Sequence, residues 1–263
     1  MAPENAQDLA GQTAVVTGSS SGIGRAIALE LAAAGAAVWV HARRSREAAE
    51  ATAQQIRQRG CASEVMLCDL AQQASHETLV ERAWAWHGGV DLWVNNAGAD
   101  VLTGEAAAWP FERKLEELWR VDVTATARLS RLIGARMKQR GSGVIVNLGW
   151  DQAEHGMAGD SGELFAAVKG AVMAFTKSLA RSLAPQVRVN CLAPGWIRTS
   201  WGDRASDYWQ RRAQQESLLQ RWGTPEDVAR VARFLVSPAA SFITGQTIPI
   251  NGGFRGGYTA HAD

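Results

Sequence analysis

The small residues from Thr17 to Gly24, Thr-Gly-Ser-Ser-Ser-Gly-Ile-Gly, form the stretch with the clearest chemical potential in this sequence. They follow an apolar, strand-like run and open a helix-like one. The first N–H groups of a helix lack intrahelical partners and carry the positive end of the helix dipole, so this turn can bind a pyrophosphate. Glycines here can also be simple turn residues, but the flanking strand and helix favour a nucleotide site. Its predicted contacts are Gly18, Ser20, Ser21, Gly22, Ile23 and Gly24.

Two arginines, Arg43 and Arg44, follow the second predicted strand, in Val40-His41-Ala42-Arg43-Arg44. An acidic residue there would bind both ribose hydroxyls of NAD and repel a 2′-phosphate, and it is missing. Guanidinium groups bind phosphate with paired hydrogen bonds, so the segment favours NADP(H) over NAD. The alternative is that both arginines are a solvated helix start.

Short apolar runs alternate with longer helix-like stretches, which is typical of parallel strands joined by helical crossovers. Seven runs are predicted strands, mostly apolar as expected for a sheet covered on both faces: Thr13–Thr17, Ala37–His41, Glu64–Leu67, Leu92–Asn95, Val144–Leu148, Val187–Leu192 and Thr247–Ile250. Six stretches have helical spacing: Ile23–Ala34, Ser45–Arg59, Ser75–Trp86, Leu115–Arg140, which is long enough for two helices, Ser161–Ala184 and Pro225–Val236. The predicted fold class is α/β, a single Rossmann-type doubly wound seven-stranded parallel sheet with helices on both faces.

The composition is that of one enzyme-sized domain. We expect residues 1–263 to form a single dinucleotide-binding domain, with residues 1–10 flexible and residues 200–220, which are polar and dotted with Trp, acting as a substrate lid. The 27 basic and 26 acidic residues leave a net charge of +1, which disfavours nucleic acid or an anionic membrane as partner. The sequence offers no signal peptide and no apolar run of membrane-spanning length, so a cytoplasmic location is expected. Cys61, Cys68 and Cys191 are read as buried thiols, and no metal site is predicted.

The glycine-rich turn, together with Asn95-Asn96-Ala97-Gly98 and Pro194-Gly195, resembles the short-chain dehydrogenase/reductase superfamily. The resemblance extends through Cys68-Asp69-Leu70, Lys169-Gly170-Ala171, Val189-Asn190 and residues 245–253, and is greatest to the 3-oxoacyl-carrier-protein reductase branch. It implies further cofactor contacts: Asp69 and Leu70 at the adenine, Asn96, Ala97 and Gly98 at the ribose, Lys169 at the nicotinamide ribose, and Pro194, Gly195, Ile197 and Thr199 at the nicotinamide end. It also implies a homo-oligomer, a dimer or tetramer, that pairs through the helices Leu115–Arg140 and Ser161–Ala184.

Three of the four positions to which the resemblance assigns catalysis depart from the family pattern. Phe165 stands where a tyrosine is expected, four residues before the catalytic Lys169, and the two tyrosines, Tyr208 and Tyr258, lie far downstream. Trp150, or Gly149 if the alignment slips by one position, replaces the serine, and Asp122 replaces an asparagine. Asp122 can equally be a buried polar residue that fixes a helix kink.

These departures bear directly on the chemistry. Reduction of a carbonyl develops negative charge on oxygen, which must be met by a proton donor and hydrogen bonds. A lost general acid costs about 10²–10⁴ in rate, and a lost oxyanion donor roughly 10²–10³. The standard Ser-Tyr-Lys mechanism is therefore not possible here.

The segment Asp151–Gly162 carries several polar groups, among them Asp151, Glu154 and Asp160, and either His155 or a carboxylic acid with a raised pKa is the candidate substitute acid; the alternative is a solvated acidic loop. Two functions follow. One is an NADP(H)-dependent oxidoreductase with an atypical active site, acting on a carbonyl or alcohol of a bulky or aromatic small molecule framed by Trp150, Trp196 and the lid. The other is a catalytically silent nucleotide-binding protein, regulatory or an inactive subunit of a mixed oligomer. A non-redox reaction with a structural nucleotide is the least supported.

Overall fold

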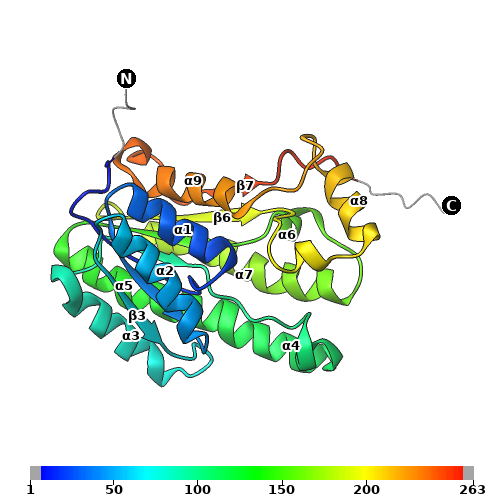
Figure 1. Ribbon diagram of the computed structural model, residues 1–263, viewed down its shortest axis with the longest axis horizontal. Coiled ribbons are helices and arrows are strands. Elements are labelled where there is room, and N and C mark those ends of the chain that lie inside the picture. Colours follow the sequence, from blue (N-terminus) through cyan, green and yellow to red (C-terminus); the bar gives the residue numbers. More distant parts are fainter. Residues whose placement is uncertain (1–6, 257–263) are drawn as a thin grey trace.

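The computed structural model describes residues 7–256, in which a parallel sheet lies between two layers of helices (Figure 1). The strands are β1 (Thr13–Val16), β2 (Ala37–Ala42), β3 (Ser63–Leu67), β4 (Leu92–Asn95), β5 (Gly143–Leu148), β6 (Val187–Pro194) and β7 (Thr247–Ile250). They pair in the order β3-β2-β1-β4-β5-β6-β7, and every neighbouring pair is parallel. The predicted fold class is confirmed.

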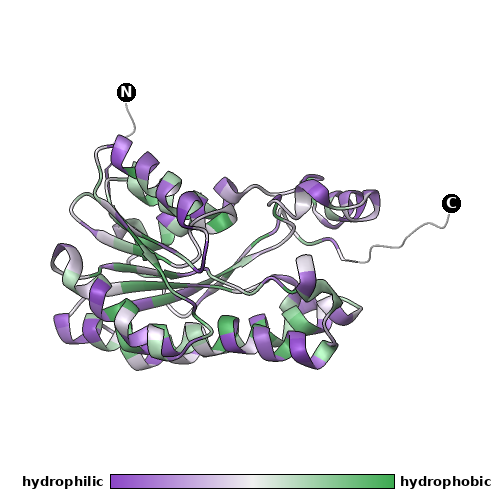
Figure 2. Cartoon of the chain, turned by 60° about the horizontal axis from the view of Figure 1, so that its bottom comes forward, coloured by the Kyte–Doolittle hydropathy of each residue, from purple (hydrophilic) through white to green (hydrophobic). Residues whose placement is uncertain are grey.

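Two helical layers cover the sheet, as the three tiers in Figure 2 show. On one face, α1 (Gly22–Ala33), α2 (Arg46–Gln58) and α9 (Pro225–Val236) pack together over a core rich in Ala, Val and Leu. On the other face lie α3 (Ala74–Ala85), α5 (Ala125–Arg140) and α7 (Asp160–Leu183), which enclose the second core with the fully buried Trp93. The sheet is buried on both sides, which explains why its strands are almost continuously apolar in sequence.

The stretch Leu115–Arg140, for which one or two helices were expected, is one helical run with an irregular centre. It starts as α4 (Phe111–Leu118), widens into a π-helical turn over Trp119–Thr124, and continues as α5. Asp122 lies in that turn, 2 % exposed. Asp122 is thus a buried polar residue at a helix irregularity, as the alternative interpretation of this residue expected.

The strand order creates a binding cleft. β1 lies between β2 and β4, so the chain leaves the carboxyl ends of these neighbours in opposite directions. Ligands of open α/β sheets bind at such a switch point. The glycine-rich turn after β1 and the Asn96–Gly98 segment after β4 lie on either side of it.

A chain of buried side-chain hydrogen bonds ties the second helical layer to the sheet. The Nδ2 group of Asn95, at the end of β4, donates to Ser130 Oγ on α5 and to Asn147 Oδ1 on β5, each at 2.8 Å. Asn147 Nδ2 in turn donates to Thr176 Oγ1 on α7 at 2.9 Å. These four residues, which we call the Asn95–Thr176 network, fix where α7 lies relative to the strand ends.

Two predicted segments remain to be placed. The region expected to be flexible, residues 1–10, lies outside the described residues for 1–6, while Leu9 is fully buried and its N–H donates to Ala34 O at 2.9 Å. The expected lid, residues 200–220, folds into a short 3₁₀ turn (Gly202–Arg204) and α8 (Asp207–Glu216). Within residues 7–256, no helix has the length and hydropathy required to cross a bilayer.

Candidate active site

At two positions, the glycine-rich turn is packed too tightly for any residue other than glycine. A Cβ on Gly18, whose φ is +64°, would lie 2.8 Å from Ala97 Cα. A Cβ on Gly24 would lie 2.3 Å from both Asn96 Nδ2 and Gly18 O. Asn96 Nδ2 donates to Thr17 O at 3.0 Å and to Gly18 O at 3.1 Å, which holds the turn closed. The arrangement fits a backbone cradle for a pyrophosphate.

His41, which the sequence analysis did not single out, supports this turn from β2. Gly18 N–H donates to its Nδ1 at 3.1 Å, and Nε2 lies 3.1 Å from Cys68 O. Because Nδ1 accepts, the ring is neutral with its proton on Nε2, which donates to the carbonyl. Burial lowers the pKa of His41 to about 4, in keeping with that state. The available sequence signal was a polar residue near the end of an otherwise apolar strand.

A cleft of about 950 Å³ runs along the carboxyl ends of β1, β2 and β4. Most of the predicted nucleotide contacts line it: Gly18, Ser20, Ser21, Gly22, Ile23, Gly24, Arg43, Arg44, Asp69, Leu70, Asn96, Ala97, Gly98 and Thr199. Arg43 and Arg44 are exposed beside it, where a ribose phosphate could reach them. The donors and the Cβ-free turn fit a dinucleotide. The remaining predicted contacts, Lys169, Pro194, Gly195 and Ile197, line a second cavity.

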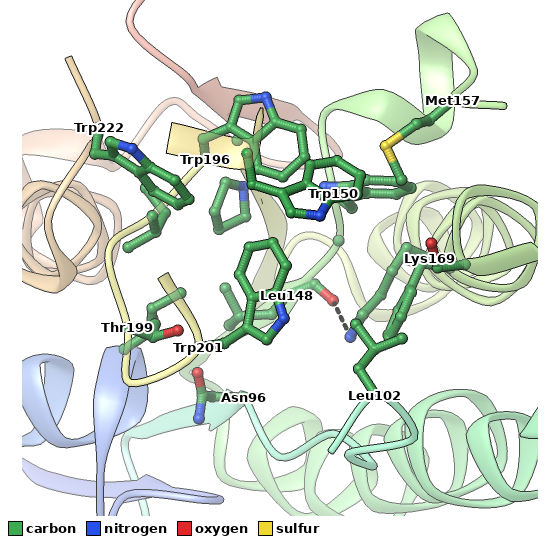
Figure 3. A pocket seen from close by; sticks show the side chains of 18 residues that line it. Asn96, Leu102, Leu148, Trp150, Met157, Lys169, Trp196, Thr199, Trp201 and Trp222 are labelled. Atoms are coloured by element: carbon green, nitrogen blue, oxygen red, sulfur yellow. Dashed lines mark hydrogen bonds between the residues drawn. The ribbon is translucent and has the colours of Figure 1, made fainter. Parts of the chain in front are cut away.

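The second cavity, which we call the Trp cavity, has a volume of about 370 Å³ (Figure 3). Indole rings of Trp150, Trp196, Trp201, Trp209 and Trp222 line it. Its lining shares six residues with that of the nucleotide cleft, so the two spaces adjoin: Ile23, Asn96, Leu102, Phe165, Thr199 and Trp201. A molecule in the Trp cavity therefore lies next to whatever occupies the near end of the cleft.

Lys169 reaches the Trp cavity from α7 and is held by a buried carboxylate. Its Nζ lies 2.8 Å from Asp122 Oδ1 and donates to Leu148 O at 3.4 Å, the bond drawn in Figure 3. The side chains of Lys169 and Asp122 are 14 % and 1 % exposed. Asp122 Oδ2 also accepts from Ala99 N–H at 2.9 Å, which ties the pair to the segment after β4. The ammonium charge is thus compensated inside the protein.

Phe165 and Trp150 meet across the cavity from Lys169's helix and from the end of β5. Their ring centroids are 6.3 Å apart in an edge-to-face arrangement, and both line the Trp cavity, as does Gly149. Ser161, Phe165 and Lys169 follow one another at intervals of four residues and all line it, because that spacing places side chains on one helix face. Ser161 therefore contributes a hydroxyl one turn before Phe165.

The proposed role of His155 is not supported by its position. It lies at the end of α6 (Gln152–His155), a short helix within the segment expected to be a loop, and it is exposed. Its ring stacks on Phe254, with centroids 4.5 Å apart, and it does not belong to the lining of the Trp cavity. Its ring therefore lies against the segment after β7.

Two buried carboxyl groups lie beside the cavity: Asp151, in the segment where a carboxylic acid with a raised pKa was considered as a substitute proton donor, and Glu216, which the sequence analysis did not assign. Asp151 Oδ2 accepts from Asn251 Nδ2 at 3.0 Å, and burial raises its pKa to about 6. Glu216, at the end of α8, accepts from Trp196 Nε1 at 2.7 Å and from Arg212 Nε at 2.8 Å. These bonds join α8 to the end of β6. The hydrogen-bond partner of Asp151 lies 100 residues away in the sequence, and Trp196, a partner of Glu216, lies 20 residues away. Glu216 is also on a helix that the sequence pattern did not predict.

Comparison with known proteins agrees with this architecture. A family model described as enoyl-(acyl carrier protein) reductase matches residues 18–255. Dehydrogenase/reductase SDR family member 4 of Oryctolagus cuniculus is 35 % identical over 259 residues, covering 93 % of this chain and 94 % of that protein. A 3-oxoacyl (acyl-carrier-protein) reductase of Agrobacterium tumefaciens C58 with NADP bound has a TM-score of 0.85 at 33 % identity, over 97 % of this chain and 98 % of that one. A 7 alpha-hydroxysteroid dehydrogenase complexed with NADH and 7-oxo glycochenodeoxycholic acid has a TM-score of 0.86 at 30 % identity, over 97 % and 98 %.

Proposed function

This chain belongs to the short-chain dehydrogenase/reductase family, and from that premise we propose that it is an NADP(H)-dependent oxidoreductase whose active site lacks the usual serine and tyrosine. The observation that carries the proposal is the junction of the nucleotide cleft with the Trp cavity at Phe165, Thr199 and Trp201. Bound nucleotide would supply a hydride at that junction. The protein would supply the cradle, Lys169 and an apolar cavity that excludes water.

The preference for NADP(H) rests on Arg43 and Arg44 beside the cleft. Hydrogen bonds to charged groups contribute about 1.5–3 kcal/mol each, so the 2′-phosphate should be recognised strongly. Replacing both arginines by Ala should weaken NADPH binding by on the order of tenfold to a hundredfold and leave NADH binding nearly unchanged. Arg46→Ala, an exposed arginine at the start of α2 that does not line the cleft, is the control. Equal affinity of the unaltered protein for NADP⁺ and NAD⁺ would refute the preference.

Catalysis without the serine and tyrosine limits the substrates. Phe165 presents a hydrocarbon ring to the cavity, and Lys169 is engaged by Asp122 and Leu148. An ordinary ketone would therefore lack a hydroxyl donor at this position, and its reduction should be slower by about 10²–10⁴ than with a positioned acid. The double substitution Phe165→Tyr with Trp150→Ser should raise ketone reduction, monitored as NADPH oxidation at 340 nm. If it does not, the cavity is more than a disabled ketone reductase.

Residues 200–220 are proposed to close over a bulky or aromatic substrate. They carry Trp201 and Trp209 into the cavity, and α8 is anchored through Glu216 to Trp196. Amide hydrogen exchange in Asp207–Glu216 should slow when NADPH and a substrate are both bound. A ligand that slows exchange in the glycine-rich turn but not in α8 would show that this segment is a fixed wall.

A silent nucleotide-binding protein is the second candidate, and the closed ion pair between Lys169 and Asp122 is what favours it. Such a protein would bind NADPH and oxidise none of it with any ketone, quinone or iminium compound. The resemblance further suggests a homo-oligomer that pairs through α5 and α7. Light scattering behind a sizing column separates a monomer from a dimer or tetramer, and a monomer at micromolar concentration would contradict that assignment.

A further inference from the structure

Six of the side chains that line the Trp cavity are aromatic: Trp150, Phe165, Trp196, Trp201, Trp209 and Trp222. Trp201 and Phe165 line both the cavity and the nucleotide cleft, so they lie where hydride would pass from one to the other. Trp150 stands edge-on to Phe165, and Trp222 lies 6.3 Å from Trp201 between centroids (Figure 3). The faces of aromatic rings carry partial negative charge. A ligand at the junction therefore meets the rings of Phe165 and Trp201 beside the polar side chains of Asn96 and Thr199.

The electrostatics of the cavity do not oppose a cation. Lys169 is the one charged residue among the described residues that line it, and its ammonium is 2.8 Å from the carboxylate of Asp122. Glu216, 4 % exposed, lies behind Trp196 and is itself paired with Arg212 at 2.8 Å. Lys169 and Glu216 thus each occur in an ion pair, and the remaining buried group, Asp151, is a carboxyl. A positive ligand meets no net positive field there.

Phe165 and Trp150 offer no proton to a carbonyl, and the hydroxyl of Ser161 lies one helical turn further from Lys169 than Phe165 does. Phe165 faces the cavity one helical turn before Lys169, and the hydrogen-bonding capacity of the ammonium is partly taken by Asp122 and Leu148 O. Reduction of a carbonyl creates negative charge on oxygen, which this surface cannot stabilise well. Reduction of a cation removes charge from the substrate, and an apolar surface favours that change.

From these observations we propose that the preferred electrophile is an iminium ion on a flat, apolar substrate; the inference rests on the proposed function, because it requires hydride from NADPH. In this step the iminium carbon gains the hydride, the C=N π pair becomes the nitrogen lone pair, and the positive charge ends on the oxidised nicotinamide. The product is a neutral amine. No proton is transferred, so this reaction does not need the tyrosine and serine hydroxyls whose positions Phe165 and Trp150 occupy.

The aromatic wall supplies the binding that replaces hydration of the cation. A cation over an aromatic face is attracted by the ring quadrupole, most strongly when water is excluded. The same type of interaction occurs beside the cavity, where the guanidinium of Arg212 lies 5.3 Å from the ring centroid of Trp209 and 5.7 Å from that of Trp196. Trp201, Trp150 and Phe165 are the rings assigned to the substrate.

The first experiment compares two electrophiles of similar shape, N-methyl-3,4-dihydroisoquinolinium and 1-tetralone. The former carries its charge at every pH. Oxidation of NADPH is followed with each, and each rate is divided by the uncatalysed rate in the same buffer, which corrects for the greater reactivity of the iminium. The rate enhancement for the iminium should exceed that for the ketone by about a hundredfold or more, and its kcat should be independent of pH between about 7 and 8.5, above the pKa of Asp151. An equal or larger enhancement for the ketone overturns the proposal.

The second experiment measures binding alone, by calorimetry at pH 8 on the protein without nucleotide, because the nicotinamide of NADP⁺ is itself a cation. N-methylisoquinolinium should bind about tenfold more tightly than isoquinoline, which has the same shape and is neutral at that pH. Asp122→Asn leaves Lys169 as an uncompensated cation and should abolish this selectivity. Trp201→Leu should reduce it without exposing a buried charge, which keeps the test open if Asp122→Asn folds poorly. Glu117→Gln removes a carboxylate from the same helical run, where it pairs with Arg120 outside the cavity lining, and should change nothing.

The outcomes separate this inference from the proposed function. Failure to bind NADPH, or to oxidise it with any electrophile, refutes the oxidoreductase assignment itself. Turnover of neutral carbonyls with no preference for the charged analogue keeps the oxidoreductase and rejects the iminium substrate. Selective binding of the cation that persists in both Asp122→Asn and Trp201→Leu would place the cation elsewhere and reject the assigned site.

Discussion

His41 and Asp151 are buried titratable groups. Burial shifts their pKa values in directions that make the free energy of unfolding depend on pH in opposite ways. Burial lowers the pKa of His41 to about 4, and burial raises that of Asp151 to about 6 against the smaller opposing effect of its bond from Asn251. In an unfolded chain the values are about 6.5 and 3.9. Each residue is 3 % exposed, so water screens neither shift strongly.

His41 binds a proton in the unfolded chain at a higher pH than in the folded one, so its contribution to stability is complete above about pH 6.5 and is lost as the pH falls toward 4. Asp151 holds its proton in the folded chain at a higher pH than in the unfolded one. Its contribution is complete below about pH 3.9 and is lost as the pH rises through 6.

Between pH 6 and pH 4 each group changes the free energy of unfolding by about 2 kcal/mol, because a difference of one unit in pKa is equivalent to 1.36 kcal/mol. The two changes nearly cancel. Relative to the unaltered protein, His41→Gln should therefore gain about 2 kcal/mol on going from pH 6 to pH 4, and Asp151→Asn should lose about as much. Urea unfolding at pH 4, 5 and 6 measures both, and taking differences from the unaltered protein removes the contribution of the other carboxyl groups.

The asparagine variant is conservative, since its amide oxygen can still accept from Asn251 as Asp151 Oδ2 does. The glutamine variant loses a ring, so a constant loss of stability is expected with it, and only the change with pH tests the reasoning. Differences that do not vary with pH, or that vary in the same direction for both variants, would show that burial does not shift these pKa values as described.

Three further predictions concern the nucleotide turn, a helix end and the buried ion pair. Gly24→Ala should abolish NADPH binding measured by fluorescence titration, because its Cβ would overlap atoms 2.3 Å away, whereas Gly170→Ala, with open space around its Cβ in α7, should retain binding and stabilise the fold by about 0.5–1 kcal/mol. Thr224→Ala removes a capping box at the start of α9 and should cost about 1 kcal/mol in urea unfolding, most of it recovered by Ser at the same position. Asp122→Asn should cost on the order of 3 kcal/mol, because it leaves the ammonium of Lys169 buried and unpaired, and Lys169→Met in the same chain should restore much of that; an additive double variant would contradict the pairing.

The fold could be predicted from sequence because local patterns of apolar and turn residues determine its strands and helices. Apolar runs such as Val144–Leu148 and the turn Thr17–Gly24 carry their meaning within a few residues, and the strands lie within about two residues of their predicted ends. The irregular turn at Asp122 could not be located this way. A π-helical turn has almost the same apolar spacing as the helices on either side of it, and its stability here comes from Lys169 and Ala99, which lie elsewhere in the chain.

Sequence patterns pointed to residues that line the two cavities, but not to the contacts that support those residues. Phe165 and Lys169 could be placed on one face because helical spacing determines it. His41 and Asp151 act through partners 23 and 100 residues away, and no local pattern announces such a contact. His155 is the reverse case: a suitable residue type near the cavity in sequence, which the structure places exposed and stacked on Phe254 at the end of a helix of four residues.

The Asn95–Thr176 network constrains how this site can be redesigned. A helix that slides by one residue rotates by about 100° and advances about 1.5 Å, which would carry Thr176 out of reach of Asn147. The helix that bears Phe165 and Lys169 therefore has a single setting on the sheet. Leucine in place of Asn147 alone should cost about 1–3 kcal/mol, because Asn95 and Thr176 each lose a hydrogen bond inside the core, and it removes the bond that sets that helix. Anyone transplanting the cavity into another scaffold should carry these four polar residues with it, although none of them touches the ligand space.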